Sequence, residues 1–312
     1  MGRDEQLAPL DLAAVREAVL RWAGERSRSV AVRERRDPYA VLVAECMAHQ
    51  TQIERVADAW RAFLATFPTL EALARARPSD VLRAWGNLGY NRRALALQRA
   101  ARAIVAEHGG AVPADPATLE RLPGVGPYTA RAVAAIAHGR PVGPVDTNVR
   151  RVLGRLLAPE GRVPAPSIQA LADALAAGTV DPGAWAYALM DLGATVCRRQ
   201  PRCEACPLAR SCAHGTSRGV ATGGRRRRGN GEANLGPRSR PERSPFPATR
   251  RWLRGRILER LRAAADDDWV AIEPPIGGHG PAAVEAALAT LEREGLLERH
   301  PTDPTRARLP LA

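Results

Sequence analysis

The chain has 312 residues, of which 45% are hydrophobic, and it carries a net charge of +13 with an isoelectric point near 10.9. This length suits about two domains, and the excess of positive charge favours a polyanionic partner. All 46 basic side chains are arginine, which excludes chemistry that needs a lysine Schiff base, and the sequence lacks an apolar run long enough for a transmembrane helix.

From residue 12 to residue 212 the sequence reads as successive amphipathic helices with short connectors rich in Pro, Gly and Asp. Strand patterns are nearly absent from this part of the chain. We therefore expect a mostly α-helical fold.

Glu45 is the first candidate for chemistry along the chain. A helix is expected to begin at Pro38, because proline suits the first helical turn, and Glu45 then falls about two turns in, among apolar residues. A carboxyl group in such a setting loses solvation, so its pKa should rise, which suits a general acid near neutral pH. The alternative is a glutamate on a solvated helix face.

A turn that can capture a phosphate is expected at residues 123–128, which read Pro-Gly-Val-Gly-Pro-Tyr. Gly124 and Gly126 permit a tight turn between helices, so that backbone N–H groups at the start of the second helix can approach a phosphate oxygen. The valine between them would anchor the turn in the core. A plain helix connector is the alternative, because such connectors are short and often contain glycine. A carboxylate, Asp146, follows about twenty residues later.

Four of the five cysteines lie within sixteen residues, in the pattern Cys-x5-Cys-x2-Cys-x5-Cys. Four thiolates this close favour a [4Fe–4S] cluster or a zinc ion held by four sulfurs. Structural zinc usually uses two Cys-x2-Cys pairs far apart, so the single pair favours iron–sulfur, with zinc and unliganded thiols as alternatives. The candidate ligands are Cys197, Cys203, Cys206 and Cys212.

Residues 213–247 change to Gly, Ser, Pro and Arg, with eight arginines against two glutamates, and predict a disordered basic linker. Residues 248–312 read as helix, strand, helix and hairpin, which predicts a small winged-helix-like α+β module. Such modules bind DNA or mediate protein contacts. Because the tether is flexible, we expect this module to add DNA affinity and not base choice.

Taken in order, these motifs resemble the MutY-type adenine glycosylases of the helix-hairpin-helix superfamily, which are endonuclease III-like, iron–sulfur proteins. The resemblance covers about residues 11–212. It implies a two-lobed helix-hairpin-helix glycosylase domain that ends in an iron–sulfur loop and carries a [4Fe–4S] cofactor. The implied reaction is hydrolysis of the N-glycosidic bond of adenine mispaired with 8-oxoguanine or guanine.

The resemblance also implies roles for residues at the reacting centre. Glu45 is implied to protonate adenine N7, and Asp146 to face the oxocarbenium-like sugar. Tyr128 and Asn148 are implied to position that carboxylate. Endonuclease III-type enzymes have a lysine where Tyr128 stands, so a lysine-dependent lyase is excluded and hydrolysis should leave an abasic site.

On the DNA side, the resemblance implies that Gln50 wedges into the duplex, Thr51 contacts the base opposite adenine, and Tyr90 stacks beside an opposite 8-oxoguanine. The implied partner is double-stranded DNA with a mispaired base. We expect a monomeric, cytoplasmic, nucleoid-associated protein.

The chain departs from this family at several places, among them His49, where the family has glutamine, and Asp191, where it has glutamate. Val32 stands where the family has tryptophan and Ala48 where it has leucine, so the wall around the flipped base is expected to be wider. The gap between Cys197 and Cys203 is one residue shorter than in the family, which bears on cluster geometry.

Two other functions stay open from the sequence. A thymine or uracil glycosylase for G mismatches also has tyrosine at the Tyr128 position, although Gln50, Thr51 and Tyr90 favour adenine. A non-enzymatic iron–sulfur DNA-binding regulator belongs to another class. Such a regulator would need neither Glu45 nor Asp146.

Overall fold

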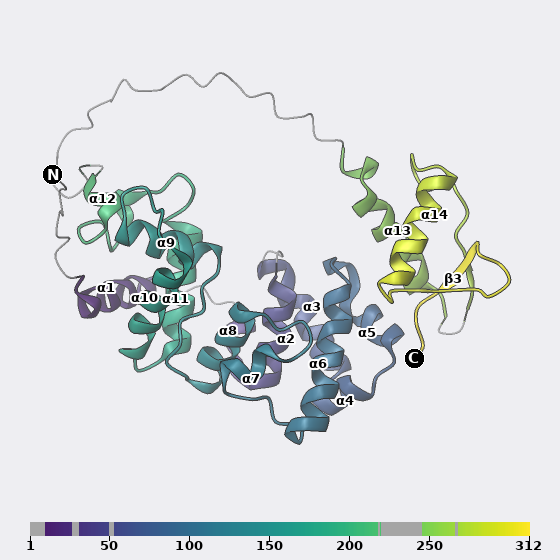
Figure 1. Cartoon of the computed structure of the whole chain (residues 1–312), viewed down its shortest axis with the longest axis horizontal. Coiled ribbons are helices and arrows are strands. Elements are labelled where there is room, and N and C mark those ends of the chain that lie inside the picture. The colour runs from purple at the N-terminus through teal and green to yellow at the C-terminus, as the bar shows by residue number, and fades with distance from the viewer. Residues whose placement is uncertain (1–9, 27–30, 50–52, 218, 220–244, 266–267) are drawn as a thin grey trace. The chain divides into compact units, whose positions relative to one another are not determined.

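The computed structural model describes residues 10–26, 31–49, 53–217, 219, 245–265 and 268–312, and these are mostly helical, as expected (Figure 1). None of the helices in these ranges is long and apolar enough to cross a membrane. The α-helices are α1 (Leu12–Gly24), α2 (Pro38–Ala48), α3 (Ile53–Thr66), α4 (Leu70–Arg75), α5 (Pro78–Trp85), α6 (Arg92–His108), α7 (Pro116–Glu120), α8 (Pro127–His138), α9 (Thr147–Leu157), α10 (Ala165–Ala177), α11 (Pro182–Thr195), α12 (Ala213–Ser217), α13 (Arg250–Ala263) and α14 (Pro281–Arg293). The short 3-10 helices are η1 (Ala31–Arg33), η2 (Gly86–Leu88), η3 (Cys203–Ala205) and η5 (Phe246–Ala248).

An Asp-Pro pair opens several of these helices. At α7 and α11 the aspartate side chain accepts a hydrogen bond from a backbone N–H of the first turn, and proline occupies the first helical position. Asp37 does the same for α2, where its Oδ1 accepts from Ala40 N at 2.9 Å. These caps fix where each helix begins, and α2 in turn carries Glu45.

The chain divides into two compact units, which are described separately. The first comprises residues 1–45, 113–121 and 125–228, as far as they are described. Its core lies between α1, α9, α10 and α11, where Trp185 and Leu153 are fully buried. The cysteine loop packs on the same core. This unit therefore joins the cysteines and the helix that follows Asp146 in one hydrophobic cluster.

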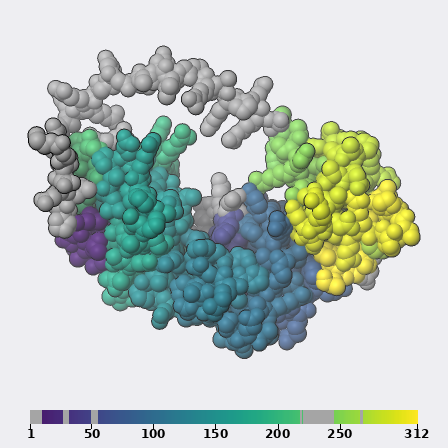
Figure 2. Space-filling view, in the orientation of Figure 1, coloured from purple at the N-terminus to yellow at the C-terminus, as the bar shows by residue number. Residues whose placement is uncertain are grey.

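The second unit comprises residues 46–112, 122–124 and 229–312. Helices α3 to α6 bury Trp85 and Phe63, whose rings meet edge to face with centroids 6.1 Å apart. The C-terminal residues, yellow in Figure 2, belong to the same unit. Within this unit α13 packs against α5.

The C-terminal module has the element order that the sequence predicts. Its strands are β1 (Val270–Ala271), β2 (Glu298–Arg299) and β3 (Arg306–Arg308), which form an antiparallel sheet in the order β1-β3-β2. Val270 pairs with Ala307, and Glu298 pairs with Arg308. Helices α13 and α14 pack against each other beside the sheet.

One stretch of the expected linker is helical. Residues 213–217 form α12, which packs on α9, and Thr216 Oγ1 donates to Cys212 O at 3.1 Å. Anchoring to the cysteine loop thus extends the ordered structure past the residue at which composition alone places the boundary. Residues 220–244 of that linker lie outside the described residues.

Candidate active site

Glu45 is a buried carboxyl group on α2. Only 7% of the residue is exposed, and its neighbours Val43, Ala44 and Met47 are buried as well. Burial raises the pKa of Glu45 to about 7, and the negative charge of Asp146 contributes to the rise. Near neutral pH a large share of this group is therefore protonated, as a general acid requires.

Tyr128, in the first turn of α8, is the hydrogen-bond partner of Glu45. Burial, followed by the charge of Glu45, raises the pKa of the Tyr128 phenol well above its usual value. The phenol is thus a permanent donor, and a donor stabilises the ionised carboxylate that remains after a proton leaves Glu45. The Tyr128 hydroxyl also lies 3.7 Å from Met190 Sδ, and the charge of Asp146 adds to the rise of its pKa. The expected role of Tyr128 in positioning Asp146 stays a prediction.

Asp146 is the N-cap of α9. Its Oδ1 accepts from Val149 N at 2.6 Å, and its Oδ2 accepts from Asn148 Nδ2 at 2.8 Å. These two donors hold the carboxyl group in one orientation at the N-terminus of the helix. Asn148 thus holds Asp146, as the resemblance implies. The site combines one protonatable carboxyl with one fixed carboxylate.

A second layer around Glu45 was not found from the sequence. Arg33 of η1 forms a bidentate ion pair with Asp191 of α11, with N–O distances of 2.6 and 2.9 Å. The Arg33 guanidinium also lies 4.5 Å from the ring centre of Tyr187, whose pKa is raised by burial and then by the charge of Glu45. These partners lie far apart in the chain, so local spacing carries no signal of the pair.

Arg151 joins the Asp146 side of the site to the cysteine loop. Its guanidinium donates to Asn148 Oδ1 at 2.8 Å, to Gly193 O at 2.7 Å and to Cys197 O. Since Asn148 in turn donates to Asp146, a continuous hydrogen-bonded path runs from the first cysteine to the carboxylate.

The cysteine loop fits a metal cluster by its donor set. Cys197, Cys203, Cys206 and Cys212 all line one cavity. Burial, with the nearby thiols adding to it, raises the pKa of Cys206 to about 12, so a bound cation would have to displace its proton. Arg155 Nη1 lies 3.4 Å from Cys197 Sγ and can donate to a cluster-bound sulfur. Among the described residues, no group of three or more His, Cys, Asp or Glu side chains is already arranged around a single metal ion.

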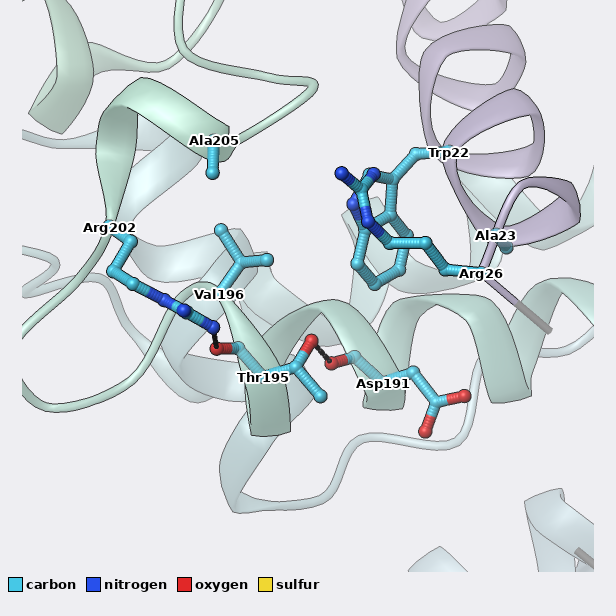
Figure 3. Close-up of a pocket in the computed structure, with 8 residues that line it drawn as sticks. All are labelled: Trp22, Ala23, Arg26, Asp191, Thr195, Val196, Arg202 and Ala205. Atoms are coloured by element: carbon cyan, nitrogen blue, oxygen red, sulfur yellow. Dashed lines mark hydrogen bonds between the residues drawn. The ribbon is translucent and has the colours of Figure 1, made fainter. Parts of the chain in front are cut away.

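A separate cavity of about 250 Å³ lies between α1, α11 and the cysteine loop (Figure 3). Trp22 of α1 and Arg26, which follows that helix, line one side of it. Arg202 lines it from the loop, where its guanidinium donates to Thr195 O at 2.8 Å. The cavity shares Asp191 with the second layer of the site. Because neither Glu45 nor Asp146 lines it, this cavity does not hold the carboxyl pair.

Gly124 and Gly126, in the turn before α8, differ in whether the backbone requires glycine at that position. Gly124 has φ +78°, and a Cβ there would lie 2.6 Å from Ala96 Cβ. Gly126 is extended, with φ −93°, and a Cβ would meet nothing within 4 Å. Val125 between them is buried, as expected. The fold thus requires glycine only at Gly124, and the missing side chain at Gly126 leaves open space before α8.

We expect Gly124→Ala to lower the free energy of unfolding by about 2 kcal/mol or more, through a left-handed backbone and a steric clash. Gly126→Ala is the matched control and should change stability by less than about 0.5 kcal/mol. Chemical denaturation of both variants measures the difference. Equal losses would contradict the distinction between the two positions.

The DNA-side residues are only partly described. Gln50 and Thr51 lie outside the described residues. Tyr90 is described, and 44% of it is exposed, so it is not a core aromatic. Arg93 Nη1 donates to the carbonyls of Cys46 and His49 at 2.8 and 2.6 Å, which ties the end of α2 to the helix that follows Tyr90.

Val32 and Ala48 differ in their surroundings. Val32 is buried, with 3% exposed, whereas Ala48, at the end of α2, is partly exposed. Ala48 is smaller than the leucine that the family has there, so it leaves space at a partly exposed position. Val32 is packed in the buried interior of the first unit.

Residues 43–177 match the family model described as "HhH-GPD superfamily base excision DNA repair protein". The chain is 39% identical over 264 residues to the adenine DNA glycosylase of Mycolicibacterium smegmatis, covering 84% of both proteins. It is 41% identical over 251 residues to that of Mycobacterium tuberculosis H37Rv, covering 79% of this chain and 78% of the relative. The human adenine DNA glycosylase is 39% identical over 216 residues, which span 65% of this chain and 39% of the human protein.

Solved structures show the same fold. A thermostable thymine-DNA glycosylase aligns with a TM-score of 0.61 and 27% identity, over 66% of this chain and 97% of that one. Endonuclease III in a non-covalent DNA complex aligns with a TM-score of 0.55 and 23% identity, over 67% and 98%.

Proposed function

Because this chain belongs to the MutY-type branch of the HhH-GPD superfamily of base excision DNA repair proteins, we propose that it is a monofunctional adenine DNA glycosylase. Its substrate is adenine opposite 8-oxoguanine or guanine in duplex DNA. The observation that carries the proposal is the pair formed by a buried, protonatable Glu45 and an Asp146 side chain held as the N-cap of α9.

The two carboxyl groups have opposite tasks in this reaction. Protonation of adenine N7 by Glu45 makes the base a better leaving group, and breaking the N-glycosidic bond leaves positive charge on the sugar. The Asp146 carboxylate stabilises that charge. Water then adds to the sugar and gives up a proton, which returns to the Glu45 carboxylate. The donors of Asn148 and Val149 N hold the carboxylate in place, so that little reorganisation is needed during the reaction.

The product is an abasic site in an intact strand. A strand-cleaving lyase would need an amine nucleophile of the lysine type, and this chain contains only arginine, whose guanidinium stays protonated. Strand breaks should therefore appear only after alkali treatment.

DNA contacts come from several elements in this proposal. The backbone N–H groups at the start of α8 bind a phosphate across the open space at Gly126. Gln50 and Thr51 enter the duplex at the mispair, and Tyr90 stacks beside the base opposite adenine. We place the glycosylase domain at residues 11–212 and the winged-helix-like module at 248–312. Of the basic segment 213–247 between them, α12 packs on the glycosylase domain and the remainder is the linker.

The cysteines would hold a [4Fe–4S] cluster that serves as a scaffold for the arginines of the loop. Protein purified anaerobically should contain about four iron atoms per chain and show broad visible absorption. Cys197→Ser should weaken the loop and lower DNA affinity, because it removes one cluster ligand and the sulfur that Arg155 Nη1 contacts. Stoichiometric zinc without iron would refute the cluster assignment.

A thymine or uracil glycosylase for G mismatches is the second candidate, and the similarity to a thymine-DNA glycosylase structure favours it. One panel separates the two: duplexes with A, T or U opposite G or 8-oxoguanine, assayed under single-turnover conditions and then treated with alkali. We expect cleavage at A and little at T or U. Cleavage mainly at T or U would support the second candidate, and no cleavage at any base would support a non-enzymatic DNA-binding regulator.

A further inference from the structure

Tyr90 is an exposed aromatic ring flanked by two guanidinium groups. Its φ of +48° lies in the left-handed region that non-glycine residues rarely adopt, and such strain is often found at functional sites. The guanidinium of Arg93 lies 5.2 Å from the ring centre and that of Arg251 lies 4.8 Å from it. An exposed ring with adjacent cations is a typical platform for a stacked nucleobase.

The two arginines come from different parts of the second unit. Arg93 belongs to α6, in the helical part of the unit. Arg251 belongs to the first turn of α13, in the C-terminal module. The module that the sequence placed on a flexible tether therefore contributes a side chain to the surroundings of Tyr90.

The loop that carries Tyr90 is also held by the module. Arg262 of α13 donates to Gly86 O, to Asn87 Oδ1 at 3.1 Å and to Asn91 Oδ1 at 3.2 Å. Arg83 of α5 donates in return to backbone carbonyls at the end of α13. Removing the module would leave these partly buried donors and acceptors to find new partners. The hydrogen bonds therefore fix α13, and with it Arg251, beside Tyr90.

We infer that Arg251, which the C-terminal module supplies, contacts the base opposite the excised adenine and determines the preference for 8-oxoguanine over guanine. The inference rests on the proposed function and replaces the expectation that the module adds only affinity. 8-Oxoguanine differs from guanine by a carbonyl oxygen at C8 and a hydrogen on N7. The arginine guanidinium has hydrogen-bond donors and no acceptor. It can therefore donate to the C8 carbonyl oxygen of 8-oxoguanine, whereas guanine has a C–H group at that position and accepts no hydrogen bond there.

The test uses the full chain and two duplexes, with adenine opposite 8-oxoguanine or guanine. The measured quantity is the ratio of the two single-turnover rates at saturating enzyme. Arg251→Ala should lower this ratio about three- to tenfold, in the range of one cation–π or hydrogen-bond contact. Arg250→Ala removes the same charge from the preceding, exposed position of the chain and should leave the ratio within about twofold.

Two further variants distinguish a direct contact between Arg251 and the base from the effect of its charge and from the effect of module docking. Arg251→Lys keeps the charge but loses the planar fork, so it should preserve the salt dependence of binding while the rate ratio stays low. Arg262→Met should lower the ratio as well, because it releases the module from the loop. Combined with Arg251→Ala, it should add little further loss, since both changes act on one contact.

An equal fall of both rates in Arg251→Ala, with a flatter salt dependence, would make Arg251 a phosphate contact and overturn the inference. An unchanged ratio in Arg262→Met would overturn it too. If the wild-type chain removes adenine from neither duplex, the proposed function itself fails. If it removes adenine and Arg251→Ala keeps the wild-type ratio, only the role of the module fails.

Discussion

Asp146→Asn is expected to lower the single-turnover rate of adenine release by about 10²-fold or more while duplex affinity changes little. The substitution removes the charge that faces the cationic sugar. It should preserve the fold, because asparagine caps helices as well as aspartate and can still accept from Val149 N. Rapid-quench assays give the rate, and binding to an uncleavable duplex gives the affinity.

Asp115→Asn is the matched control for this change. Asp115 caps α7 through a hydrogen bond from Thr118 N at 2.8 Å, so its replacement also removes one charge from an exposed helix cap. Its rate should stay within about twofold of the wild type. A near-normal rate in Asp146→Asn would show that the carboxylate does not stabilise the transition state.

Glu45→Gln is expected to abolish the pH dependence of adenine release together with most of the rate. In the wild type the pKa of Glu45 is raised to about 7, so the protonated acid predominates below that pH. The rate should therefore be highest below about pH 7 and fall by up to tenfold per pH unit above it. The glutamine variant lacks a transferable proton and should lose about 10²-fold or more at every pH. A wild-type profile that rises through pH 7 to 9 would exclude Glu45 as the acid.

The same residue should link stability to pH. Its pKa is higher in the folded state than the ordinary value of 4.5, so the folded chain binds the proton more tightly. The free energy of unfolding should fall as pH rises from about 4.5 through 7, by on the order of 3 kcal/mol. Glu45→Gln should lack that part of the fall. Identical pH dependence in both proteins would contradict burial of the carboxyl.

Local sequence patterns predict much of the helical architecture and the two carboxyl groups. The offset of Glu45 from Pro38 places it on the buried part of α2, and the Pro-Gly-Val-Gly segment predicts the turn before α8. The pattern overstates the need for glycine at Gly126, because spacing cannot show which glycine is left-handed.

Contacts between distant residues escape the sequence. The Arg33–Asp191 pair joins residues 158 positions apart, and Arg251 reaches Tyr90 from the other side of the linker. Helical periodicity reports which face of each helix is apolar but not which helices meet. The second layer around Glu45 and the partner of Tyr90 are therefore visible only in the folded chain.

A duplex in which 7-deazaadenine stands opposite 8-oxoguanine tests the central claim most directly. Carbon replaces N7 in this base, so Glu45 has no ring nitrogen to protonate there, while the shape of the base is preserved. We expect the wild-type protein to bind this duplex about as tightly as the adenine duplex and to release the base about 10²-fold more slowly or worse. Release at the rate of adenine would contradict an acid-assisted mechanism through Glu45.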